Sequence, residues 1–259
     1  MDKRLKVFLY VCFGISFVAG GVFHCLGLDF SSTYGMSFAS AYMLIPTISV
    51  LITQKTCGDK LFSDVGVNFK INKWWIVAWL LMPVVNILAM FSSALLPGVS
   101  LDPNSELVTK VIADMSAKEV EIDGWGLLAI TIFSSMFAGL TINALFALGE
   151  ELAWRGFLPR VMDAWGFWKK SLITGIIGGF WHMPLILMGH NYPDHPIAGV
   201  FMMVLLCVVM TPVFLYLREK SGSTMVAAIA HGTLNGSAGI SVMYLAGGND
   251  LLCGTTGLV

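Results

Sequence analysis

The 259-residue sequence has few charged residues, and this shortage argues against an ordinary soluble domain. Asp, Glu, Lys and Arg together make up 12% of the chain, whereas a soluble domain carries about 25%. Hydrophobic residues make up 56% of the chain, and the mean hydropathy is +0.78. The composition therefore predicts an integral membrane protein.

Other absences narrow the chemistry that the chain can carry. The sequence has no H-E-x-x-H metal motif, nucleotide-binding loop, internal repeat or low-complexity segment. We therefore expect no nucleic-acid partner and no separate soluble domain, so that residues 1–259 form a single membrane domain. The cysteines are scattered through apolar runs without metal-type spacing, and we interpret them as buried small apolar residues rather than as disulfides: Cys12, Cys25, Cys57, Cys207 and Cys253.

Long apolar runs are what the sequence does contain. A helix that crosses about 30 Å of hydrocarbon needs about 20 apolar residues. The runs predict an all-α bundle of seven transmembrane spans, or eight if the glycine-rich stretch near Gly236 breaks the last one. The predicted spans cover residues 6–28, 36–53, 74–96, 125–149, 170–189, 197–217 and 224–246.

The distribution of positive charge predicts the orientation of these spans. All 15 Lys and Arg residues except Lys110 and Lys118 fall on one side of the predicted bundle. Because positive loops stay in the cytoplasm, we expect a cytoplasmic N-terminus. The compact chain and the lack of a retention signal suggest a prokaryotic cell membrane, with membrane lipids as surroundings. The two exceptions lie in an acidic outer loop, 97–124, which we expect to hold a short helix on the outer interface.

Two adjacent carboxylates end the predicted fourth span. Glu151 and Arg155 are four residues apart, in the favourable order for an ion pair on one helix face. Glu150 lies about 100° around the helix and has no local counter-charge. A charge inside a membrane is costly, so Glu150 indicates a functional site.

Later spans carry further polar residues at membrane depth. His182 lies in the sequence Gly178-Gly179-Phe180-Trp181-His182-Met183-Pro184, and His231 and Asn235 share one face of the last span. Each feature also has a structural interpretation. The two histidines and the amide could form hydrogen bonds between helices, and Glu151 and Arg155 could form a purely structural ion pair. Because all of these groups need burial, one polar cavity explains them more economically.

Such a cavity has the groups needed to hydrolyse a peptide bond. A carboxylate beside a neutral imidazole can remove a proton from water, and a second imidazole with an amide can hydrogen-bond an oxyanion. The alternative is a metal site, in which Glu150, His182 and His231 would hold zinc. The missing zinc spacing favours a metal-free catalytic water, with no cofactor.

Three motifs together resemble one known family. Glu150-Glu151-Leu152-Ala153-Trp154-Arg155 is similar to the E-E-x-x-x-R signature of the CPBP intramembrane proteases. That family includes type II CAAX prenyl endopeptidases and the bacterial "Abi" group of bacteriocin-processing and immunity proteins. Trp181-His182-Met183-Pro184 resembles the second family motif, and His231-Gly232-Thr233-Leu234-Asn235 fits the H-x-x-x-N motif. The resemblance covers about 145–240, in the family's order.

The resemblance implies a role for each matching residue. Glu150 would be the general base and share the catalytic water with His182, while His231 and Asn235 would form the oxyanion site. Glu151 and Arg155 would be a supporting pair that orients the base. The family has been described both as metalloproteases and as metal-free glutamate proteases, so the resemblance leaves the metal question open.

One position departs from the family pattern. The second motif is often F-x-x-x-H, but position 178 is glycine here. Either Phe180 supplies the aromatic side chain instead, or the pocket is wider than in the family. The sequence therefore leaves the fit of the substrate open, but not the expected chemistry.

These observations predict an intramembrane endopeptidase. Its partner would be a peptide or protein substrate that is membrane-associated, either without a lipid or with a prenyl or other lipid modification. The alternative is a non-catalytic immunity or scaffold protein of the same fold, which would not need Glu150. A proton-coupled transporter ranks last, because the two halves of the chain show no matched broken helices.

Overall fold

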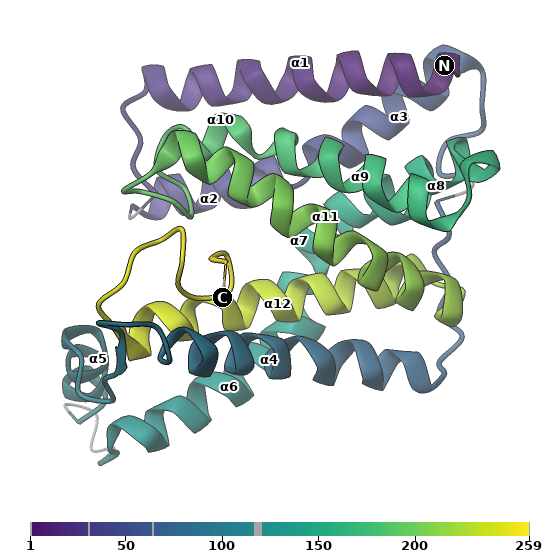
Figure 1. Ribbon diagram of the computed structural model, residues 1–259. Coiled ribbons are helices and arrows are strands. Elements are labelled where there is room, and N and C mark those ends of the chain that lie inside the picture. Colours follow the sequence, from purple (N-terminus) through teal and green to yellow (C-terminus); the bar gives the residue numbers. More distant parts are fainter. Residues whose placement is uncertain (1, 31, 64, 117–120, 259) are drawn as a thin grey trace.

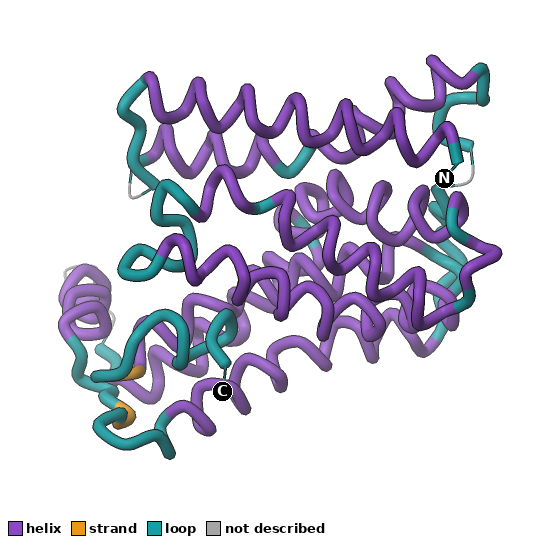
Figure 2. The backbone as a smooth tube through the Cα atoms, turned by 45° about the horizontal axis from the view of Figure 1, so that its top comes forward, coloured by secondary structure: helices purple, strands orange, loops and turns teal. Residues whose placement is uncertain are grey.

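The computed structural model describes residues 2–30, 32–63, 65–116 and 121–258, and within them the chain is almost entirely helical. Lys118 of the predicted outer loop lies outside these residues. The strands in the described part are β1 (Ser100–Leu101) and β2 (Leu245–Ala246), which pair antiparallel. Figure 2 shows them as two short orange segments among the helices. The predicted all-α class is confirmed.

The N-terminal part of the chain forms apolar helices of different lengths and one helix with a more polar sequence. Their bounds are α1 (Lys3–Cys25), α2 (Thr33–Tyr42), α3 (Ile45–Cys57), α4 (Lys73–Ser93) and α5 (Glu106–Ser116). The last of these is the short helix expected in the outer loop. It buries Val108 against α6 and α12.

The second part of the chain holds the three motifs. Its elements are α6 (Gly124–Leu140), α7 (Ile142–Glu151), a π-helical turn η1 (Leu152–Phe157), α8 (Leu158–Val161), a 3₁₀ turn η2 (Asp163–Trp165), α9 (Phe167–Trp181), α10 (Met183–Ile186), α11 (Pro196–Ser221) and α12 (Thr224–Tyr244). In Figure 1, α1 lies at the top, α4 and α6 lie at the bottom, and α9, α11 and α12 lie between them.

Each predicted span corresponds to helix, but the helices differ in length and apolarity. Among the described residues, four are long and apolar enough to cross a membrane alone: α1, α2 with α3, α4, and α11. The pair α6 and α7 makes a fifth if the two count as one bent span. Of the other two predicted spans, α9 has only 15 residues, and α12 carries His231 and Asn235 among its apolar residues. The chain is an all-α membrane bundle.

One predicted span is bent, but not the one that contains the glycine-rich stretch near Gly236. Helix α12 runs unbroken through Gly236, so the alternative with an eighth span does not apply. The break lies instead at Thr141, whose φ of −118° and ψ of −102° are not helical, and α6 and α7 meet there at 51°. Both halves pack on α12, and Gly139 permits this because a Cβ there would lie 2.3 Å from Thr233 Oγ1. The bend brings Glu150, at the end of α7, toward the centre of the bundle.

The chain after α12 folds back across the bundle as an anchored segment, residues 249–258. Asp250 accepts hydrogen bonds from the His195 ring (2.6 Å) and from the backbone N–H of Asp194 and of His195. Partial burial raises the pKa of Asp250, but these hydrogen bonds outweigh it and hold the pKa below its ordinary value. The chain is also tied to α4, since Gly254 N–H donates to Ser93 Oγ at 2.9 Å.

The packing of α9 on α11 depends on one of the two paired glycines. A Cβ at Gly179 would lie 2.5 Å from Val204 Cα, whereas a Cβ at Gly178 would have nothing within 4 Å. We expect Gly179→Ala to destabilise the protein by about 1–3 kcal/mol, because the helices must separate. Gly14→Ala on the exposed face of α1, where a Cβ also meets nothing within 4 Å, serves as the control. Thermal unfolding in detergent measures both, and equal midpoints would contradict the assigned contact.

Candidate active site

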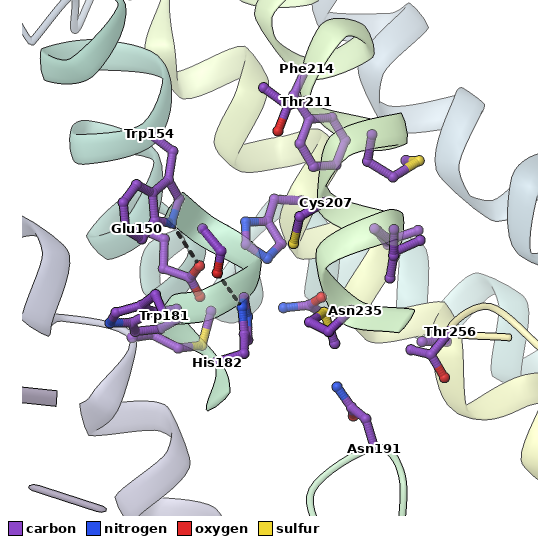
Figure 3. A pocket seen from close by; sticks show the side chains of 18 of the residues that line it. Glu150, Trp154, Trp181, His182, Asn191, Cys207, Thr211, Phe214, Asn235 and Thr256 are labelled. Atoms are coloured by element: carbon purple, nitrogen blue, oxygen red, sulfur yellow. Dashed lines mark hydrogen bonds between the residues drawn. The ribbon is translucent and has the colours of Figure 1, made fainter. Parts of the chain in front are cut away.

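The turn after α7 holds both carboxylates by side chains four residues further along. Arg155 Nη1 donates to Glu151 Oε1 at 2.8 Å, which confirms the predicted ion pair. Trp154 Nε1 donates to Glu150 Oε2 at 3.0 Å (Figure 3). Both carboxylate side chains are buried, with Glu150 3% and Glu151 0% exposed. The two glutamates are therefore held separately, one by a cation and one by a neutral donor.

Arg155 is further fixed by helix α11. Its Nη2 donates to Thr211 Oγ1 at 3.3 Å, and its guanidinium lies 4.7 Å from the ring centroid of Phe214. A guanidinium over an aromatic face is attracted by the ring quadrupole. These contacts tie η1 to α11.

Glu151 contacts a different catalytic candidate from the one predicted. His231 Nδ1 lies 2.8 Å from Glu151 Oε1, the same oxygen that accepts from Arg155. The predicted supporting pair was expected to orient Glu150, whereas it bonds the imidazole on α12. Because an ionised carboxylate only accepts hydrogen bonds, His231 donates through Nδ1 and keeps Nε2 for another group.

His182 lies at the junction of α9 and α10. Its backbone N–H bonds to Gly179 O rather than to Gly178 O, and its ring Nδ1 donates to Gly178 O at 2.8 Å. A carbonyl only accepts, so the proton is on Nδ1, and in the neutral ring Nε2 is an acceptor. Gly178, which departs from the family pattern, thus orients His182 through its carbonyl.

The four predicted catalytic side chains line one cavity of about 340 Å³, together with Trp154, Arg155 and residues of α2, α9, α11 and α12. Figure 3 shows Glu150, His182 and Asn235 around the same space, each from a different element. The predicted single polar cavity is therefore present. Its wall also contains residues that the sequence motifs did not indicate: Asn191, Cys207, Thr211, Thr255 and Thr256.

The polar residues of the cavity do not form a preformed metal site among the described residues. Within the part of the chain that the structure describes, no three His, Cys, Asp or Glu side chains are grouped closely enough to hold a metal ion. Glu150, His182 and His231 thus line the cavity without forming a preformed ligand set.

The sequence reasoning missed Trp154 although its signal was available. Trp154 follows Glu150 by four residues, the same spacing that identified the Glu151–Arg155 pair. A carboxylate can be held by a neutral donor as well as by a cation, and an indole N–H is such a donor. The wall residues of the 249–258 segment had no comparable signal.

Comparison with known proteins agrees with the motifs. A family described as "Type II CAAX prenyl endopeptidase Rce1-like" matches residues 125–237. The curated protein "CAAX prenyl protease 2" of Methanococcus maripaludis is 28% identical over 180 residues, a match that covers 64% of this chain. It covers 57% of the length of that relative.

Proposed function

We propose that this chain is a member of the CPBP family of intramembrane proteases and an endopeptidase that uses water to cut a membrane-associated peptide. One observation carries the proposal. Glu150 on α7, His182 at the junction of α9 and α10, and the pair His231 and Asn235 on α12 line a single cavity. These are the groups that water attack on a peptide carbonyl needs.

The base side of the reaction uses Glu150 and His182. Trp154 occupies Glu150 Oε2, which leaves Oε1 to accept a proton from water. His182 Nε2 accepts a second hydrogen bond from the same water, since Nδ1 is bonded to Gly178 O. As the water loses a proton to Glu150, its oxygen bonds to the carbonyl carbon, and that proton later passes to the leaving nitrogen when the C–N bond breaks.

The oxyanion side uses His231 and Asn235. In its imidazolium form His231 donates to the oxyanion through Nε2, while Glu151 accepts from Nδ1. The Asn235 amide supplies the second N–H. Glu151 and Arg155 therefore act on the oxyanion donor, and their buried pair keeps that donor fixed.

The cavity wall favours a substrate with an apolar group. Beside the polar cluster lie apolar side chains of α11, of α12 and of the turn after α2, among them Met43, Met203, Leu206, Met210 and Leu234. A cavity of about 340 Å³ is within the usual range for small-molecule pockets. We propose a prenylated or otherwise lipid-modified peptide substrate, which reaches the site from a cytoplasmic or lateral opening, and no nucleic-acid partner.

The direct test uses purified protein in liposomes and a farnesylated peptide that ends in a CAAX sequence. We expect mass spectrometry to detect release of a C-terminal fragment, faster than from the same peptide without the lipid, because the lipid concentrates the substrate in the membrane. We propose a metal-free reaction, so 1,10-phenanthroline should leave the rate unchanged. Loss of activity with the chelator and its return with zinc would support the metal alternative. No cleavage of either peptide would contradict the proposed function.

A further inference from the structure

We propose that Trp154 is a positioning residue, which holds the carboxylate of Glu150 so that one chosen oxygen faces the catalytic water. The inference rests on the proposed function for its catalytic part. Its structural part, the hydrogen bond between the indole N–H and Glu150 Oε2, is independent of any activity.

The hydrogen bond distinguishes the two carboxylate oxygens. An indole Nε1–H can only donate, so it requires an accepting oxygen. It occupies Oε2 at 3.0 Å inside a site where Glu150 is 3% and Trp154 2% exposed. A buried carboxylate without this donor could rotate or exchange its two oxygens. The indole thus fixes which oxygen is left for the water.

Two aromatic neighbours hold the indole itself. Trp154 meets the ring of Phe8 edge-on, with centroids 6.0 Å apart, and meets Trp181 at 5.7 Å. Phe8 also packs against Phe157 in the same turn, at 5.6 Å. Edge-to-face pairs at these separations are favourable and restrict ring rotation.

Part of the support for Trp154 comes from outside the matched motifs. Phe8 lies on α1, whereas the family match covers 125–237. The N-terminal helix therefore reaches the reacting groups through two successive contacts, Phe8 with Trp154 and Trp154 with Glu150. Because α1 is joined to the site in this way, we infer that it contributes to the geometry of the active site.

A second tryptophan in the same cluster provides the matched comparison. Trp181 is 1% exposed, and its Nε1 has no hydrogen-bond partner among the described residues. Burial of an indole in this cluster therefore does not by itself produce a hydrogen bond. The bond of Trp154 is specific to its position four residues after Glu150.

The kinetic test compares Trp154→Phe with Trp181→Phe. Phenylalanine keeps most of the ring packing and removes the N–H in both. We expect Trp154→Phe to lower kcat about tenfold to thirtyfold with KM within about twofold, because the lost bond orients the base rather than the substrate. We expect Trp181→Phe to lower kcat by less than about threefold. Phe8→Ala, which keeps the N–H but loosens the ring, should give an intermediate loss in kcat. Equal losses for the two phenylalanine variants would overturn the inference.

A spectroscopic test needs no substrate. In protein labelled with ¹⁵N-tryptophan in detergent micelles, the indole signal of Trp154 is assigned by its disappearance in Trp154→Phe. We expect this signal to be shifted downfield and protected from solvent exchange, and to lose both properties in Glu150→Ala. An unchanged signal would overturn the hydrogen bond. If the signal responds but Trp154→Phe keeps full kcat, the positioning role is overturned. If the unmodified protein does not cleave the peptide, the proposed function is contradicted. The catalytic part of this inference then fails with it, whereas the hydrogen bond between Trp154 and Glu150 is still tested by the indole signal.

Discussion

Glu150→Gln is expected to lower kcat by about 10² to 10⁴-fold, the range for loss of a general acid–base group. The amide oxygen of glutamine can still accept from Trp154 Nε1, whose present bond to Glu150 is 3.0 Å, so the fold should be retained. The amide cannot take the proton of the water, and this is the reason for the loss. Release of the C-terminal fragment from the farnesylated peptide, measured under saturation, gives kcat.

The matched control for this change is Glu106→Gln. Glu106 is an exposed carboxylate at the start of α5, on an element that contributes no residue to the cavity. Wild-type kcat is expected for it. A Glu150→Gln protein that cleaves at the normal rate would argue against the base and would leave the non-catalytic scaffold as the better reading of the fold.

Arg155→Met is expected to destabilise the protein by about 3–5 kcal/mol, because it leaves a buried carboxylate without its cation. Glu151 is fully buried, and its Oε2 has no hydrogen-bond partner among the described residues. The double variant Glu151→Gln/Arg155→Met removes both charges together, and we expect it to recover most of the lost stability. Unfolding in detergent, followed by circular dichroism, measures the three proteins.

An exposed ion pair provides the comparison for this effect. Arg4 Nε lies 2.6 Å from Asp59 Oδ2 near the start of α1, with side chains 45% and 22% exposed. The Arg4 guanidinium holds the pKa of Asp59 below its ordinary value, but solvent screens the pair. Arg4→Met should leave the unfolding midpoint unchanged.

The double variant Glu151→Gln/Arg155→Met could also prove no more stable than Arg155→Met. That result would contradict the prediction and show that the pair is needed for more than charge balance.

The sequence predicted those contacts that local spacing determines. Glu151 and Arg155 lie four residues apart, and the same helical turn brings them together in the structure at 2.8 Å. The polar residues of the later spans were also predicted to share a cavity, because each needed burial and none had a local partner. These two arguments need only the helix period and the cost of burying charge.

Contacts between distant segments could not be obtained in this way. The bond between Glu151 and His231 joins residues 80 positions apart, and it depends on how α12 packs on α7. The bend at Thr141 lies beside a close approach of Gly139 to Thr233 that only the folded bundle shows, whereas the glycine content near Gly236 suggested a break that α12 does not have. Glycine permits both a break and close packing, so its presence alone does not distinguish them.

The 249–258 segment contributes to the cavity wall, whereas the residue described before α1 does not. Thr255 and Thr256 form part of the cavity wall, and Thr255 Oγ1 donates to Asn86 Oδ1 while Thr256 O accepts from the Tyr192 hydroxyl. Asp2 at the other end is exposed and precedes α1. A purification tag or a fluorescent fusion is therefore better placed before residue 2. The same addition after residue 258 would disturb the cavity wall that the substrate must contact.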